Sequence, residues 1–381
     1  MMSKKRTFVP VMVMASIGAS SLASAASTET VKIGAALALT GGLAHLGKDS
    51  ESGARLAVEE TNAKGLTING KNVVLVLDSQ DDGGDPRTAT QVAQKLADDK
   101  VIAVVGHQTS GTSIPASKIY SDAGIVQISP AATNPLYTQQ GFKTTYRLMA
   151  TDAQQGPALA TFAAKQLGAK TVAVVDDATA YGQGLADQFA KGASQQGMKV
   201  ISRDSSTDKT IDFKGILTKI KGENPDVIMY GGTDAAGSQL VKQAFQLGLR
   251  AKILGGDGMC TEKSAALTGV ASKNLICSEA SVPLEKMPGG PGFAKRFAAR
   301  FNQPIQGYAP FGYDAVNVIV DAMKRANSTD PAKVLAALPA TQVKGVIGPI
   351  SFQPNGDLNN TGISVYQFVD GKKGLLSTVK Q

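Results

Sequence analysis

Short apolar stretches alternate with longer amphipathic stretches along most of this chain. Residues 101–106 and 125–129 are almost continuously apolar, which is typical of strands whose two faces are both covered. Between such stretches, apolar residues recur three or four positions apart, as at Ala54, Ala57 and Val58, which is typical of amphipathic helices. Strands that alternate with helices predict an α/β fold with parallel sheets and helices on both faces.

The alternation of strand and helix runs twice through the chain. The first run predicts strands at 31–39, 72–78, 101–106 and 125–129 and helices at 50–63, 85–98 and 113–124. The second run predicts strands at 171–176, 199–203, 226–230, 252–254 and 274–277 and helices at 152–167, 181–196, 211–221 and 234–247. Further helices are expected at 292–301, at 309–325 and from 330, with β structure at 348–352 and 362–368. No low-complexity segment separates the two runs, so we expect two lobes joined by ordered crossings.

The N-terminus has the three parts of a secretory signal peptide. Residues 4–6 are basic, residues 8–17 are largely apolar, and residues 23–25 form an Ala-Ser-Ala site, so we expect cleavage after Ala25. The alternative, a membrane anchor, needs about 20 apolar residues, which is more than this run provides. Because the first cysteine is Cys260, we expect an exported, soluble chain without a lipid anchor.

Composition and charge exclude one class of partner. The chain has 43% hydrophobic but only 5% aromatic residues, which suits an α/β protein rich in Ala, Val and Gly. Its formal net charge is +8, but the basic residues are scattered, and they form no clustered stripe of the kind that nucleic-acid binders need. We therefore expect no nucleic-acid partner.

The strongest enzyme-like signal is a partial phosphate-binding motif. Residues 42–48 match G-x-x-x-x-G-K between a strand and a helix, but Asp49 stands where a P-loop needs Ser or Thr to hold the metal. The two histidines, His45 and His107, show no metal-ligand spacing, and no G-x-S-x-G, H-E-x-x-H or dinucleotide fingerprint occurs. We therefore expect no catalytic residue, no cofactor and no metal site.

Two polar loops follow neighbouring strands of the first run. Residues 109–113 carry four hydroxyls between a strand end and a helix start, where unpaired N–H groups and the helix dipole suit a carboxylate. The alternative is that Ser113 is only an N-cap in a polar loop. The second loop, 129–135, adds the hydroxyl of Thr133 at the same sheet edge, unless it is a plain proline-bounded turn.

A third loop, 255–258, follows a strand of the second run. Its glycines allow close approach of the backbone, and Asp257 supplies one negative charge; the alternative is a turn residue between glycines. A carboxylate-binding loop on one lobe and an acid on the facing lobe would bind the carboxylate and the ammonium of a zwitterion, respectively.

The chain has two cysteines, Cys260 and Cys277. In an oxidising compartment an isolated pair usually forms a disulfide, and adjacent parallel strands of the second run could bring the two together. Two buried free thiols are the alternative.

Several short segments, in order along the mature chain, resemble the leucine/isoleucine/valine-binding proteins of branched-chain amino-acid ABC transporters. They are 40–42, 106–117, 129–133, 155–157, 181–184, 230–232 and 348–349. The resemblance implies a type I periplasmic binding-protein fold, in which two Rossmann-like lobes with parallel sheets are joined by three interlobe crossings and the ligand lies between them. It assigns 26–150 and 281–359 to the first lobe and 151–280 and 360–381 to the second. It also implies a periplasmic monomer that binds a small amino acid and serves an inner-membrane ABC permease.

The resemblance assigns roles to residues that would bind the zwitterion. The hydroxyls of Ser110 and Thr133, with backbone groups at Thr109 and Ala131, would hold the α-carboxylate. Asp257 stands where the family has an acid that binds the α-ammonium, although that acid is usually a Glu, which is one methylene longer.

Four further residues would surround the ligand side chain. Tyr181 matches an aromatic residue that closes over the ligand, and Tyr308 matches one near the side-chain pocket. Leu46 stands where an aromatic is often found and Thr233 where a Tyr can be. Leu46 in place of an aromatic predicts an apolar and wider pocket; the alternative is that Leu46 packs against the hinge and shapes no pocket. We expect Leu, Ile and Val as ligands, with Phe also admitted. The alternatives are a binder of another small acid or amide, such as an aromatic acid, and a nucleotide-dependent enzyme at 42–48.

Overall fold

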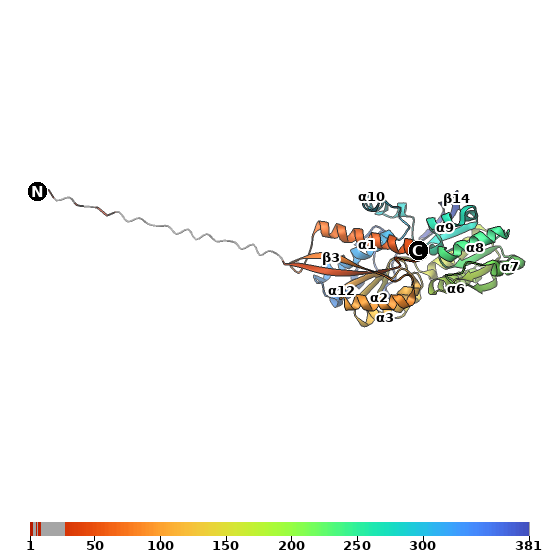
Figure 1. Ribbon diagram of the computed structural model, residues 1–381, viewed down its shortest axis with the longest axis horizontal. Helices are drawn as coiled ribbons and strands as arrows, with labels where there is room; N and C mark the ends of the chain where they lie inside the picture. The colour runs from red at the N-terminus through yellow and green to blue at the C-terminus, as the bar shows by residue number, and fades with distance from the viewer. Residues whose placement is uncertain (3–4, 6, 9–26, 381) are drawn as a thin grey trace.

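The computed structural model describes residues 1–2, 5, 7–8 and 27–380. The expected signal peptide, 1–25, therefore falls almost entirely outside the described residues. The described chain forms two α/β lobes, each built on its own sheet, which lie side by side in Figure 1. The first lobe holds the N-terminal strands and helices, drawn in red to orange, and the second holds those drawn in yellow-green to cyan.

The first lobe is built on a six-stranded sheet with the order β2-β3-β1-β4-β5-β6, parallel except for the β2–β3 hairpin. Its strands are β1 (Thr28–Leu37), β2 (Leu66–Ile68), β3 (Lys71–Asp81), β4 (Ala103–Gly106), β5 (Val126–Ser129) and β6 (Thr145–Arg147). The helices between them are α1 (Ala44–Lys64), α2 (Pro86–Asp98), α3 (Ser110–Asp122) and α4 (Leu136–Gln139). Every residue of β4 and β5 is buried, as their continuous apolar runs predict.

The second lobe is built on a seven-stranded sheet with the order β15-β14-β11-β10-β9-β7-β8, parallel up to β11 and antiparallel at β14 and β15. Its strands are β7 (Thr171–Asp176), β8 (Lys199–Ser205), β9 (Val227–Gly231), β10 (Lys252–Gly255), β11 (Leu275–Glu279), β14 (Gly362–Val369) and β15 (Lys372–Lys380). Its helices are α5 (Asp152–Gln166), α6 (Ala180–Gln195), α7 (Lys214–Glu223), α8 (Asp234–Gln246), η1 (Asp257–Met259), α9 (Glu262–Thr268) and η2 (Gly269–Asn274).

The chain returns to the first lobe after β11. The returning elements are η3 (Leu284–Lys286), α10 (Gly290–Phe301), α11 (Ala309–Ala326), α12 (Pro331–Ala337), η4 (Leu338–Ala340), β12 (Val343–Lys344) and β13 (Pro349–Ile350). Phe293 of α10 and Ile319 of α11 share one hydrophobic core with Val31 and Ile33 of β1. Because β14 and β15 then join the second sheet, the chain passes between the lobes three times, which confirms the expected crossings.

The helix expected to begin at 113 begins at Ser110. Thr109 is its N-cap, because the Thr109 hydroxyl accepts from the N–H of Thr112 at 3.2 Å in a capping box. Ser113 is therefore not the N-cap. It lies in the first turn of α3, where its hydroxyl donates to the carbonyl oxygen of His107 at 3.1 Å.

Four of the described strands were not predicted from the sequence: β2, β6, β12 and β15. The β2–β3 hairpin turns at Asn69-Gly70, whose φ values of 48° and 73° suit the turn that Asn-Gly favours, so this signal was present in the sequence. β15 pairs with β14 at the edge of the second sheet. Its sequence, KKGLLSTVK, has no regular alternation of polar and apolar residues, so periodicity could not indicate a strand there.

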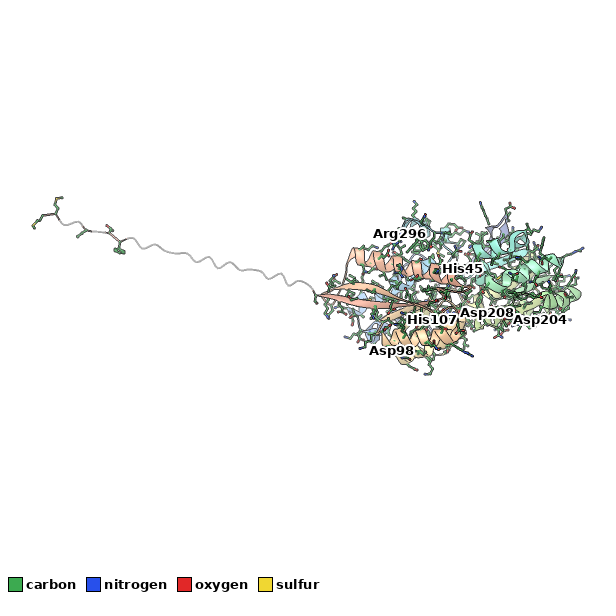
Figure 2. All side chains as sticks on the ribbon, viewed as in Figure 1. His45, Asp98, His107, Asp204, Asp208 and Arg296 are labelled. Atoms are coloured by element: carbon green, nitrogen blue, oxygen red, sulfur yellow. A yellow bond between two sulfur atoms is a disulfide. The ribbon has the colours of Figure 1, made fainter. Side chains whose placement is uncertain are left out.

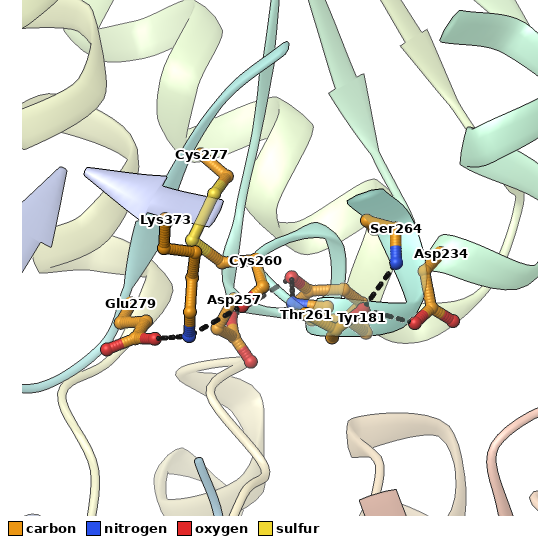
Figure 3. Close-up of a disulfide and its surroundings, with 10 residues drawn as sticks. Tyr181, Asp234, Asp257, Cys260, Thr261, Ser264, Cys277, Glu279 and Lys373 are labelled. Carbon is orange, nitrogen blue, oxygen red and sulfur yellow. Dashed lines mark hydrogen bonds and ion pairs between the residues drawn. A yellow bond between two sulfur atoms is a disulfide. The ribbon is translucent and has the colours of Figure 1, made fainter. Parts of the chain in front are cut away.

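Cys260 and Cys277 form a disulfide, which confirms the expected pairing (Figure 3). Cys277 lies in β11, and Cys260 follows η1 just after the adjacent parallel strand β10, so their Cα atoms are 5.2 Å apart. Within the part of the chain that the structure describes, no helix combines the length and apolar character that a membrane span requires.

Candidate functional site

Two buried hydroxyls meet at the carboxyl edge of the first sheet. The loops after β4 and β5 lie there together, because these strands are parallel neighbours. Ser110 and Thr133, from these two loops, are each 1% exposed or less. The hydroxyl of Ser110 accepts from the N–H of Asn134 at 3.1 Å, whereas the hydroxyl of Thr133 has no hydrogen-bond partner among the described residues. The edge therefore holds a buried hydroxyl that can serve a ligand.

The start of α3 keeps unpaired donors at the same place. Thr109 satisfies the N–H groups of Thr112 and Ser113 through its hydroxyl and its carbonyl oxygen. The Thr109 N–H is itself engaged, because it donates to the Thr112 hydroxyl at 3.2 Å. The N–H groups of the first helical residues, Ser110 and Gly111, have no intrahelical partner. They therefore offer donors to an anion at the positive end of the helix dipole.

Ala131 contributes its backbone to the site. It follows β5 and is 7% exposed. Its N–H donates to the hydroxyl of Ser129 at 3.3 Å, so its carbonyl oxygen is the backbone group that can face a ligand. A carbonyl oxygen accepts hydrogen bonds and therefore suits an ammonium rather than a carboxylate.

Asp257, in η1 of the second lobe, is a buried acid held by two tyrosines. Its Oδ1 accepts from the hydroxyl of Tyr181 and its Oδ2 from the hydroxyl of Tyr308, each at 3.0 Å. Tyr181 belongs to α6 of the second lobe, whereas Tyr308 precedes α11 of the first lobe. In the amide orientation that satisfies both of its polar atoms, Gln155 also donates to Oδ1 at 3.0 Å. The acid is therefore held from both sides of the interlobe boundary.

The electrostatics of this cluster favour hydrogen bonding by the phenols. Burial raises the pKa of Asp257, and the hydroxyls of Tyr308 and Tyr181 oppose that shift. Burial raises the pKa of both tyrosines well above the usual value, with Asp257 as the second cause. Both phenols therefore stay protonated at neutral pH and can donate to the carboxylate.

The glycine before Asp257 is required by close packing. A Cβ at Gly256 would lie 2.3 Å from Cδ2 of Leu185 and 2.6 Å from the hydroxyl oxygen of Tyr181. A larger residue there would force the side chains of Leu185 and Tyr181 to move. The Gly-rich sequence thus brings the backbone that carries Asp257 against the ring of Tyr181.

Leu46 and Thr233 contribute apolar groups on either side of the boundary. Leu46, in α1, is buried in the hydrophobic core of the first lobe, which also contains Tyr308. Thr233 is the N-cap residue of α8 in the second lobe, and its methyl carbon lies 3.2 Å from where a Cβ on Gly258 would stand. Tyr308 of the first lobe and Tyr181 of the second therefore meet at Asp257. Thr233 lies close to Gly258 beside Asp257, whereas Leu46 is placed only within the core of the first lobe.

Direct contacts hold the two lobes together in a closed arrangement. His45 of α1, which Figure 2 labels where the lobes meet, places its Nε2 2.8 Å from Oδ2 of Asp234 in α8. The ammonium of Lys263 donates to the carbonyl oxygen of Gly42 at 2.9 Å. The side chain of Asn134 donates to the carbonyl oxygen of Ala180 at 2.6 Å. In this arrangement Tyr181, Asp257 and Tyr308 are each 6% exposed or less.

The enzyme-like signals have structural roles. Asp49 accepts from the N–H groups of Tyr308 and Ala309 at 2.7 and 2.8 Å, so it caps the start of α11. Burial raises the pKa of Asp49 to about 6. His107 is fully buried between Asp82, at 2.6 Å, and Tyr120, at 3.1 Å. The described residues contain no group of three or more His, Cys, Asp or Glu that could hold a metal ion.

One buried acid of the site was missed by sequence reasoning. Asp152 is the first residue of α5, and its N–H donates to the carbonyl oxygen of Thr133 at 2.8 Å. It is completely buried, and neither carboxylate oxygen has a hydrogen-bond partner among the described residues. Burial, followed by the charge of Asp257, raises its pKa to about 8, and the neighbouring Thr133 hydroxyl opposes that shift. An acid in the first turn of a helix is an ordinary preference, so its sequence position carried no functional signal.

Comparison with known proteins identifies the family. The family described as periplasmic binding protein matches residues 30–374. An amino acid binding protein of Pseudomonas aeruginosa is 35% identical over 346 residues, which are 90% of this chain and 91% of that protein. The leucine-, isoleucine-, valine-, threonine-, and alanine-binding protein of the same organism is 33% identical over 344 residues, again 90% and 91% of the two chains.

A solved structure agrees with these matches. The leucine binding protein from Thermotoga maritima superposes with a TM-score of 0.85 at 29% identity, and the match covers 92% of this chain and 98% of that one. The α/β fold with two lobes and the family resemblance are thereby confirmed. The chain belongs to the periplasmic binding protein family, as a relative of its leucine/isoleucine/valine-binding members.

Proposed function

We propose that this protein is the substrate-binding component of an ABC transporter, and that it binds a branched-chain amino acid between its lobes for delivery to an inner-membrane permease. The observation that carries the proposal is the pairing of buried hydroxyls at a helix start in one lobe with a buried acid, Asp257, in the other. The relatives named for binding leucine, isoleucine and valine support the same class of ligand.

The two charged groups of an amino acid would have separate partners. The α-carboxylate would accept from the hydroxyls of Ser110 and Thr133 and from N–H groups that follow Thr109 at the start of α3. The α-ammonium would donate to Asp257 and to the carbonyl oxygen of Ala131. Burial of two charges is tolerable only when each is paired, and this arrangement pairs both.

The ligand side chain would lie among Leu46, Tyr181, Tyr308 and Thr233. In this proposal the four groups would present apolar surface from both lobes, and none of the four carries a charge. A Lys, Asp or Glu side chain would therefore be buried without a partner. Each buried methylene contributes about 0.8 kcal/mol, so leucine or isoleucine would be preferred over alanine by up to about 100-fold. We propose the ligands Leu, Ile and Val, with Phe admitted by the wider pocket.

Ligand binding would be linked to movement of the lobes. We propose that one moving body is 26–150 with 281–359 and the other is 151–280 with 360–381. The separate hydrophobic cores of the two sheets support this division. Contacts such as His45 with Asp234 belong to the closed arrangement, so ligand binding between the lobes would further favour the closed state that a permease recognises. The protein would act as a monomer.

The site of action would be the periplasm. The basic, apolar and Ala-Ser-Ala parts of residues 1–25 support export and cleavage after Ala25. The family to which the chain belongs is named for the same compartment.

The rival ligands and activities fit the site less well. An aromatic acid without an amine would leave Asp257 buried with no cation to pair. A nucleotide at 42–48 would place phosphate beside Asp49, whose carboxylate already caps α11. We therefore propose that the protein acts by binding alone.

Titration calorimetry on the ligand-stripped mature chain tests this proposal. The panel would contain each standard amino acid, an aromatic acid such as benzoate, and ATP. The expected result is tight binding of Leu, Ile and Val, weaker binding of Ala, and no heat with Asp, Glu, Lys or ATP. Tight binding of benzoate or of a charged amino acid, without binding of leucine, would reject the proposed ligand class.

A further inference from the structure

Asp152 is a buried carboxyl group that no other residue pairs. The side chain is completely buried, and both oxygens lack a hydrogen-bond partner among the described residues. The neighbouring hydroxyl of Thr133 also lacks a partner. An unpaired buried carboxylate is costly, because it has lost its hydration without compensation. A group of this kind at a binding site indicates a ligand group that completes its hydrogen bonds.

The position of Asp152 lies within the site already described. Its N–H donates to the carbonyl oxygen of Thr133 at 2.8 Å, so the residue directly adjoins the hydroxyl of the first lobe. On the other side, its Oδ2 lies 3.5 Å from where a Cβ on Gly184 would stand, in α6 one turn after Tyr181. Asp152 therefore lies between the first-lobe hydroxyl loop and the helix that carries Tyr181.

The charged and titratable groups around Asp152 leave it without a cation. Arg147 of β6 is the cation near it, but the Arg147 guanidinium is engaged by Asp357 at 2.7 Å and by the carbonyl oxygen of Asn134 at 2.9 Å. The remaining neighbours with acidic groups are Asp257 of η1 and Tyr181 of α6. The charges of Asp257 and Asp152 both contribute to the raised pKa of Tyr181.

Two adjacent buried acids cannot both be ionised cheaply, and the structure distinguishes between them. Asp257 accepts from Tyr181 and from Tyr308, which stabilise its anion. Neither oxygen of Asp152 has a hydrogen-bond donor among the described residues, and the Thr133 hydroxyl and the charge of Arg147 oppose the rise of its pKa without cancelling it, so a proton shared by the pair belongs on Asp152. Burial followed by the charge of Asp257 raises the pKa of Asp152 to about 8, which agrees with a neutral carboxyl group at pH 7.

We propose that Asp152 is a second carboxylate for the ammonium of the ligand, and that ligand binding expels the proton that Asp152 holds in the ligand-free protein. This inference rests on the proposed function, since it requires an amine ligand in this site. In the exchange, the carboxylic acid of Asp152 loses H⁺ to the solvent buffer, and the resulting carboxylate accepts a hydrogen bond from the incoming R–NH₃⁺. No covalent bond in the ligand changes.

The pH dependence follows from linkage. Because the ligand binds the ionised form of Asp152 and the ligand-free protein in this closed arrangement holds the acid form below pH 8, binding to that arrangement releases a proton in that range. The affinity then rises with pH by up to about tenfold per unit below pH 8 and levels off above it. A protein without the Asp152 carboxyl group should show neither the proton release nor this rise of affinity with pH.

Calorimetric titration of the mature protein with leucine measures the proton directly. The heat at pH 7 is compared in phosphate and in Tris, whose ionisation enthalpies differ, and the difference gives the number of protons released. We expect close to one proton for the wild type at pH 7 and much less at pH 9. Asp152→Asn, a neutral analogue of the protonated acid, should release none and should bind leucine at least tenfold more weakly at pH 8.

Asp314→Asn provides a matched control. Asp314 is another fully buried acid whose pKa burial raises to about 6, but it accepts from the N–H groups of Val346 and Ile347, at 3.0 and 2.9 Å. This variant should keep the wild-type proton count. The wild-type count itself does not depend on whether either variant folds.

The outcomes separate this inference from the proposed function. Leucine binding to the wild type without proton release, or an unchanged proton count in a folded Asp152→Asn variant, would overturn the role of Asp152 and leave the proposed function standing. Absence of binding by any amino acid would overturn both.

Discussion

The hydroxyl of Tyr308, in the first lobe, donates to Oδ2 of Asp257, in the second lobe, at 3.0 Å. Tyr181 donates to Oδ1 of the same acid at the same distance, but from within the second lobe. The acid that we assign to the ligand ammonium is therefore also the acid that connects the lobes (Figure 3 shows its surroundings in the second lobe). Ligand binding and lobe closure act on one carboxylate, so each should favour the other.

The two tyrosines should differ in their effect on closure. Tyr308→Phe removes a hydrogen bond between the lobes, whereas Tyr181→Phe removes one within a lobe. Hydrogen bonds to charged groups contribute about 1.5–3 kcal/mol, so each variant should bind leucine about tenfold or more weakly. Only Tyr308→Phe should increase the radius of gyration of the ligand-free protein in small-angle X-ray scattering. An equal increase in both variants would show that closure does not depend on the interlobe bond.

The partners of the two charged ligand groups should not contribute equally to the free energy of leucine binding. Asp257→Asn leaves a buried ammonium with a weaker partner, and loss of such a partner typically costs about 3–5 kcal/mol. Ser110→Ala should cost less, because the N–H groups at the start of α3 remain. Dissociation constants for leucine, with circular dichroism to verify folding, check this order. Near wild-type affinity of the Asp257→Asn variant for leucine would contradict the pairing of Asp257 with the ligand ammonium.

The positions of the hydroxyl residues at the sheet edge could be predicted from the sequence, whereas the full set of buried groups at the site could not. The apolar runs before Ser110 and Thr133 placed both hydroxyls at the ends of neighbouring parallel strands, where the structure brings them together. The start of α3 was misplaced, because Ser113 offered a capping hydroxyl as good as that of Thr109. Asp152 could not be recognised, because its importance lies in burial without a partner, which only the packing of two distant segments creates.

The disulfide should stabilise the second lobe. Cys260 and Cys277 are 17 residues apart, and closing a loop of this length contributes about 3 kcal/mol in the chain-entropy account. Replacement of both cysteines by Ser should lower the free energy of unfolding by roughly that amount in denaturant titrations. The oxidised protein, unfolded without reductant, should contain no free thiol. Two reactive thiols per chain would contradict the pairing.

Processing should remove the basic and apolar N-terminus. The protein recovered from its native compartment is expected to begin at Ala26, since residues 23–25 form the cleavage site. Intact-mass spectrometry gives the answer directly. A mass that includes Met1 or Met2 would mean that the leader is retained.

We propose above all that the protein binds the whole zwitterion of a branched-chain amino acid. A comparison of its affinities for leucine and for 4-methylpentanoate tests this most directly. The two compounds share the carboxylate and the isobutyl group, but 4-methylpentanoate has no ammonium to pair with Asp257. In calorimetric titrations of the ligand-stripped protein, we expect tight binding of leucine and binding of 4-methylpentanoate that is weaker by at least about 100-fold, because a buried acid then lacks its partner. Equal affinity for the two compounds would contradict the account.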